Sequence, residues 1–82
     1  MQYRVDPKSG NRISALGLGC MRFPGAPGRP DAKTADAIIS RAVEQGINYL
    51  DTAYLYPGNE VCVGASLERL GLRDRVLLAT KL

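Results

Sequence analysis

The sequence has 82 residues, which is enough for one small domain, and all of its apolar stretches are too short to cross a membrane. With 45% hydrophobic and 23% charged residues, the composition is typical of a globular protein and excludes a disordered tail. The net charge of +3 comes from scattered side chains instead of a basic stripe with interleaved aromatics, so we expect no binding to nucleic acid.

Metal binding, disulfides and secretion are not expected either. The two cysteines, Cys20 and Cys62, lie far apart in a chain without histidine, so neither a zinc site nor a disulfide framework is indicated. Residues 1–12 are frequently charged and lack the apolar segment of a signal peptide. We therefore expect a cytoplasmic protein that binds neither a metal ion nor a membrane.

The opening of the chain predicts a β-hairpin, a short strand and a loop. A polar turn that contains Pro7 and Gly10 separates two strand-like pieces, which is typical of a hairpin over residues 1–14. The apolar run 15–20 contains two glycines and predicts a strand that its neighbours approach closely. Residues 24–30 are rich in proline and glycine and are expected to form a loop.

The middle of the chain predicts an amphipathic helix followed by a strand. Asp31 is a suitable N-cap, and Gly46 is a suitable residue to end the helix, which should span residues 32–45. The apolar positions recur with helical spacing, at Ala35, Ile38, Ile39, Ala42 and Val43. The apolar run that follows, residues 47–53, predicts the second strand.

A second helix and a third strand complete the pattern. Asn59 is expected to cap this helix, which should end at Gly71. Residues 76–80 are almost entirely apolar and predict a parallel strand covered on both faces. Strands that alternate with helices indicate βαβ units with right-handed crossovers, so the C-terminal ends of the strands should share one edge. Ligands bind at that edge in both open and barrel versions of this architecture.

Three polar side chains are expected at this edge. Asp51 lies near the end of the second strand, Tyr56 in the loop after it, and Lys81 at the end of the third strand. Adjacent parallel strands are only about 4.8 Å apart, so Asp51 and Lys81 can meet, and the carboxylate would keep the lysine charged. A cation beside a phenol lowers the pKa of that phenol, which would make Tyr56 a usable general acid.

A proton donor of this kind suits the reduction of a carbonyl group. The carbonyl oxygen must gain a proton as a hydride reaches the carbon atom. Because no side chain supplies a hydride, a cofactor has to provide it. The residues themselves therefore indicate a reductase that uses a small-molecule carbonyl substrate.

These motifs resemble those of one family. The motif D-T-A-x-x-Y (51–56), the turn G-N-E (58–60) and a strand that ends in T-K (80–81) together resemble the aldo-keto reductases. The stretches S-A-L-G-L-G-C-M and A-V-E-Q-G-I-N-Y-L-D-T-A, like the opening hairpin, are similar to the N-terminal portion of that family. The resemblance covers essentially the whole chain and implies an NAD(P)H-dependent oxidoreductase on a (β/α)₈ TIM barrel.

The resemblance also implies roles for individual residues. Tyr56 would be the proton donor and Lys81 the partner that lowers its pKa. Asp51 would be the carboxylate that orients Lys81, and it would itself lie beside the nicotinamide. The residues implied to line the nicotinamide ribose are Gly19, Cys20 and Met21. Cys20 and Met21 are equally compatible with simple packing roles. The implied cofactor is NADPH or NADH, and the implied substrate is an aldehyde or ketone.

The length leads us to expect an incomplete barrel. A (β/α)₈ barrel takes about 250 residues, whereas residues 1–82 provide the hairpin (1–14) and about two and a half βα units (15–82). The active-site histidine of the family is absent, and its late cofactor-binding segments would be missing. We therefore expect a truncated chain that is inactive alone. Its exposed strand edge should lead to self-association or to completion by the missing part of the barrel.

Two alternatives remain open. The chain could be a catalytically silent remnant that acts only as a self-associating α/β module. It could also belong to a phosphate-binding barrel enzyme unrelated to carbonyl reduction, although such an enzyme would not need the set of Asp51, Tyr56 and Lys81.

Overall fold

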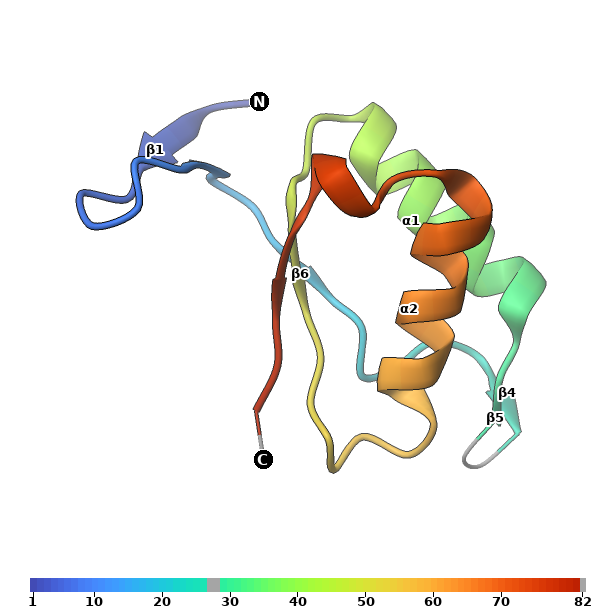
Figure 1. The fold of residues 1–82 in the computed structure, drawn as a ribbon. Coiled ribbons are helices and arrows are strands. Elements are labelled where there is room, and N and C mark those ends of the chain that lie inside the picture. Colours follow the sequence, from blue (N-terminus) through green and yellow to red (C-terminus); the bar gives the residue numbers. More distant parts are fainter. Residues whose placement is uncertain (27–28, 82) are drawn as a thin grey trace.

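The fold is a small parallel sheet with two helices on one side and a hairpin at one end (Figure 1). A computed structural model describes residues 1–26 and 29–81. In chain order the elements are β1 (Tyr3–Val5), β2 (Arg12–Ser14), β3 (Leu18–Gly19), β4 (Gly25–Ala26), β5 (Arg29–Pro30), α1 (Ala32–Glu44), β6 (Tyr49–Asp51), α2 (Asn59–Leu70), the 3₁₀ helix η1 (Arg73–Arg75) and β7 (Leu77–Ala79). Apart from β4, β5 and η1, this is the predicted order.

Strands β3, β6 and β7 form one parallel sheet with β6 in the centre. Leu50 of β6 is aligned with Leu18 of β3 and with Leu78 of β7. The predicted parallel arrangement is confirmed, so the C-terminal ends of the three strands lie at the same edge. Among the described residues β7 pairs only with β6, and Leu78 remains 36% exposed. The expectation that residues 76–80 are covered on both faces is therefore wrong, because the face of β7 that carries Leu78 is exposed.

The hydrophobic core lies between the two helices and the helix-facing side of the sheet. Its buried members are Cys20, Ile39, Val43, Leu50, Val63, Leu67 and Val76. The two residues from each helix are one turn apart, so each helix presents a single apolar face to the sheet. An ion pair between Asp36 of α1 and Arg69 of α2, with a shortest N–O distance of 2.7 Å, joins the helices at the surface. Within the described ranges, neither helix has the length and apolar character needed to cross a membrane.

The ends of α1 follow the predicted local rules. The carboxylate of Asp31 accepts a hydrogen bond from the backbone N–H of Thr34 at 2.9 Å, which confirms it as the N-cap. Gly46, just beyond the helix, has φ +97°, a conformation that favours glycine.

The start of α2 differs from the prediction. Gly58 precedes the helix with φ +67°, and Asn59 is the first helical residue, so the expected capping role of Asn59 is wrong. The Asn59 side chain is instead buried, where it bonds to other segments. The predicted C-terminal end is confirmed, because Gly71 ends the helix with φ +68°.

The segment expected to be a loop over residues 24–30 contains a short antiparallel pairing. Gly25–Ala26 pairs with Arg29–Pro30, while residues 27–28 lie outside the described residues. Glycine is required at position 25, because a Cβ atom there would lie 2.4 Å from the carbonyl oxygen of Arg29.

The predicted hairpin over residues 1–14 is confirmed by the antiparallel pairing of β1 and β2. Asn48 attaches the hairpin to the start of β6, since its Oδ1 accepts from the Ser14 backbone N–H and its Nδ2 donates to the Arg12 carbonyl, both at 2.7 Å. Figure 1 shows the hairpin at the opposite end of the sheet from the C-terminal ends of β6 and β7. The hairpin therefore leaves the C-terminal edge uncovered.

Candidate active site at the C-terminal edge of the sheet

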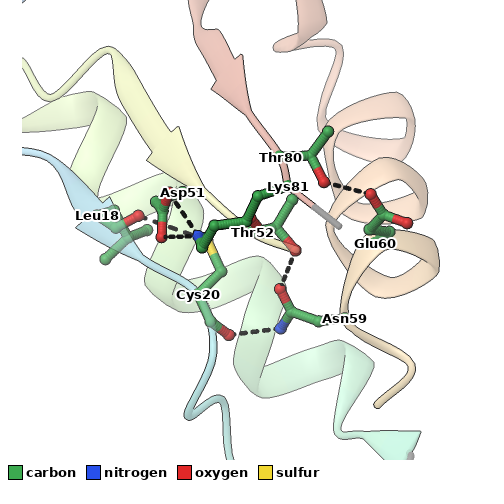
Figure 2. Close-up of polar contacts among 8 residues, drawn as sticks. All are labelled: Leu18, Cys20, Asp51, Thr52, Asn59, Glu60, Thr80 and Lys81. Carbon is green, nitrogen blue, oxygen red and sulfur yellow. Dashed lines mark hydrogen bonds and ion pairs between the residues drawn. The ribbon is translucent and has the colours of Figure 1, made fainter. Parts of the chain in front are cut away.

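Asp51 and Lys81 meet at the C-terminal edge of the sheet. Asp51 is the last residue of β6, and Lys81 lies just beyond β7. The two segments stay paired past the strands, because the Thr52 N–H donates to the Ala79 carbonyl at 2.8 Å and the Tyr54 N–H donates to the Lys81 carbonyl at 2.7 Å. The Lys81 Nζ lies 2.9 and 3.0 Å from the two Asp51 oxygens and 3.1 Å from the Thr52 carbonyl oxygen (Figure 2).

The Asp51 carboxylate is the main cause of the raised pKa of Lys81, and Tyr56 is the second cause. Lys81 therefore stays protonated throughout the neutral range, and its ammonium charge is lost as the pH rises through this raised pKa. The two side chains are 49% and 41% exposed. An ion pair this exposed contributes little to folding stability, so the arrangement is better explained by what the ammonium faces.

The ammonium of Lys81 faces the ring of Tyr56. Its Nζ lies 4.8 Å from the ring centroid, within the range of a cation–π contact. Tyr56 is half-buried in the loop after β6, where its backbone N–H donates to the Ala53 carbonyl at 3.1 Å. The structure thus brings together the three residues that the sequence proposes as catalytic, although they come from two strand ends and a loop.

The residues implied to line a nicotinamide fall into two groups. Gly19 is exposed and aligned with Asp51, and a Cβ atom at Gly19 would meet no atom within 4 Å. Met21 is 54% exposed. The space beside Asp51 is therefore open on the side of Gly19.

Cys20 does not share this exposed position. Its side chain is fully buried, its Sγ lies 3.6 Å from the Leu18 carbonyl oxygen, and burial raises the pKa of its thiol to about 11. The packing role left open for Cys20 is therefore the one that the structure shows. β3 ends at Gly19 and Met21 lies in a turn, so the three residues 19–21 do not share one exposed face.

Sequence reasoning missed a buried polar group behind the edge. The Thr52 hydroxyl donates to the Asn59 Oδ1, and the Asn59 Nδ2 donates to the Cys20 carbonyl at 2.5 Å (Figure 2). Thr52 and Asn59 are each 1% exposed. An asparagine after a Pro-Gly pair has the sequence signature of a helix cap, and its place in the G-N-E motif was the only signal that could have pointed to the site.

A second contact joins α2 to the end of β7. The hydroxyl of Thr80, the residue before Lys81, donates to the carboxylate of Glu60 in the first turn of α2 (Figure 2). The start of α2 is therefore linked to both strands that supply the edge residues.

The chain is similar to known proteins throughout this region. Residues 15–82 match the model of the aldo/keto reductase family. The chain is 38% identical over 84 residues to aldo-keto reductase YhdN of Bacillus subtilis and 40% identical over 83 residues to norsolorinic acid reductase stcV of Emericella nidulans. These alignments cover 99% and 94% of this chain but 25% and 21% of the relatives, so the chain spans about a quarter of their length.

A solved structure agrees with the sequence matches. The holo form of aldo-keto reductase AKR11C1 from Bacillus halodurans superposes with a TM-score of 0.79 at 40% sequence identity. The match covers 100% of this chain and 26% of that one. At 40% identity, the two proteins are similar in sequence as well as in fold.

Proposed function

The chain belongs to the aldo/keto reductase family, and from this premise we propose that it supplies Asp51, Tyr56 and Lys81 to an NAD(P)H-dependent carbonyl reductase. The observation that carries the proposal is the position of the Lys81 ammonium, which is held by both Asp51 oxygens and lies 4.8 Å from the Tyr56 ring. The parallel sheet is part of the barrel architecture of that family, and ligands of such barrels bind at this edge.

In the proposed reaction, these residues handle the proton. The Tyr56 hydroxyl donates a proton to the oxygen of a bound aldehyde or ketone, and the adjacent ammonium stabilises the phenolate that remains. Asp51 holds the ammonium in place and keeps it charged. The nicotinamide cofactor, NADPH or NADH, supplies the hydride when bound. Gly19 and Met21 offer the open surface beside Asp51 on which its ring would lie.

We propose that residues 1–82 need further strands to work. The described strands form an open sheet, with β3 and β7 each paired on one side only. Barrel enzymes commonly bind phosphate groups through loops after strands 7 and 8, which lie outside an arc of this size. Completion by the rest of a barrel would cover the open side of β7 and complete the cofactor site.

The free edge of β7 and the 36% exposure of Leu78 favour a second candidate, a silent module that only self-associates. An experiment in which residues 1–82 are produced without any further segment tests both candidate functions. We expect no NADPH binding in a fluorescence titration, no NADPH consumption with a generic aldehyde, and a mass above that of a monomer by light scattering. The intact natural protein should consume NADPH with the same aldehyde. Tight NADPH binding by residues 1–82 would contradict the need for further strands, and an inactive intact protein would favour the silent module.

A further inference from the structure

Behind the exposed edge, one buried asparagine connects the ends of two strands to the start of a helix. The Asn59 Nδ2 donates to the carbonyl of Cys20, just after β3, and the Asn59 Oδ1 accepts from the hydroxyl of Thr52, just after β6. The backbone N–H of Asn59 donates to the carbonyl of Tyr56 at 3.0 Å. A single residue thus contacts the ends of β3 and β6 and the loop that carries Tyr56.

Helix capping does not explain this asparagine. Gly58 occupies the cap position, and the side chain of Asn59 is 1% exposed and turned into the protein. A buried amide is costly unless both its donor and its acceptor are paired. Here both are paired with groups at the strand ends, so the contacts themselves account for an amide at this position.

Thr52 connects the buried Asn59 to the exposed residues Asp51 and Lys81. Its side chain bonds to Asn59, while its backbone carbonyl accepts from the Lys81 Nζ at 3.1 Å and its backbone N–H donates to Ala79 at 2.8 Å. Thr52 also directly follows Asp51. A shift of Thr52 would therefore move both oxygen groups that hold the ammonium.

We propose that Asn59 and Thr52 form a positioning clamp for the reaction, which sets the Lys81 ammonium and the loop carrying Tyr56 in their working geometry. This inference rests on the proposed function for its catalytic consequence. Thr52 and Asn59 are each 1% exposed, so the clamp acts through Lys81 and Tyr56. A displacement of about 1 Å at reacting groups can cost about 100-fold in rate, which makes such a clamp consequential.

The test is a matched pair of variants in the intact natural protein. Thr52→Val keeps the shape but removes the hydroxyl, whereas Thr52→Ser keeps the hydroxyl. Hydrogen exchange is measured at the amides of Tyr54 and Tyr56, which donate to Lys81 and Ala53, and at Ile39 in α1 as a reference for global opening. Thr52→Val should speed exchange at Tyr54 and Tyr56 by about tenfold more than at Ile39. Thr52→Ser should resemble the wild type.

The same variants have a kinetic signature. Thr52→Val should lower kcat by about tenfold or more and leave the KM for the cofactor unchanged, and Thr52→Ser should restore kcat. If Thr52→Val fails to fold, Asn59→Asp is measured in its place. The aspartate keeps the size of the side chain and an acceptor for Thr52, but it removes the donor to the Cys20 carbonyl. Equal acceleration at Tyr56 and Ile39, or a Thr52→Ser variant that behaves like Thr52→Val, would overturn the clamp.

Failure of the clamp and failure of the proposed function give different results. Hydrogen-exchange rates at Tyr54 and Tyr56 test the clamp without any assay of activity. A Tyr56→Phe variant with full reductase activity would refute the proposed function and leave the exchange result standing.

Discussion

Replacing Tyr56 with phenylalanine should abolish reduction of a generic aldehyde by the intact enzyme, lowering kcat by about 100- to 10,000-fold. The substitution removes only the hydroxyl, so the ring remains beneath the Lys81 ammonium, whose Nζ lies 4.8 Å from its centroid. Loss of the proton donor acts on the chemical step alone. NADPH affinity, measured by fluorescence titration, should therefore stay nearly unchanged.

The loop that carries Tyr56 also supplies the matched control. Tyr54 lies two residues earlier and its side chain is 70% exposed. Tyr54→Phe makes the same chemical change in the same loop and should leave kcat within about twofold, as expected for an exposed surface position. Equal loss of activity in both variants would assign the effect to the loop and not to a proton donor.

Replacing Lys81 with methionine should lower kcat by about 100-fold at neutral pH. Methionine keeps an unbranched apolar stem but removes the ammonium, so the phenolate left after proton donation loses its nearby cation. The effect should appear in the pH dependence of kcat as well. In the wild type, Asp51 raises the pKa of Lys81, so the ammonium is present throughout the neutral range and disappears only as the pH rises above that pKa.

Steady-state kinetics across this pH range check the prediction, with Lys33→Met as the control. Lys33 is an exposed residue in the first turn of α1, and its loss changes the net charge equally. Full activity of Lys81→Met at neutral pH would exclude a role for the ammonium.

The sheet and both helices were predictable because their signals are local or periodic. Asp31 and Gly46 mark the ends of α1 through hydrogen bonding and backbone conformation that involve only near neighbours. The meeting of Asp51 and Lys81 was also predictable. It follows from the fixed spacing of parallel strands once two apolar runs are recognised as neighbours.

The buried contacts were not predictable from the sequence by local rules. Asn59 has the local signature of a cap, and its actual partners, Thr52 and the Cys20 carbonyl, become neighbours only after the chain has folded. For Cys20, the structure shows a thiol packed in the core. The cofactor contact that the resemblance implied for this residue stays a prediction.

The short elements β4, β5 and η1 were missed for a related reason. The pairing of β4 with β5 depends on a close backbone approach at Gly25 that proline and glycine content does not reveal. In η1, the Arg75 N–H donates to the Leu72 carbonyl at 2.9 Å, which tightens the turn between α2 and β7. Charged residues in such a turn have no distinctive pattern.

The account depends on two neighbouring strands bringing a carboxylate and an ammonium to one edge, and the pKa of Lys81 in the intact protein tests this most directly. Carbon-13 NMR of the lysine Cε atoms, titrated with pH, should place the pKa of Lys81 above its ordinary value of about 10.4. In Asp51→Asn the pKa of Lys81 should fall back toward that value, because the carboxylate that raises it is gone. A Lys81 pKa that does not change between the wild type and Asp51→Asn would contradict the account.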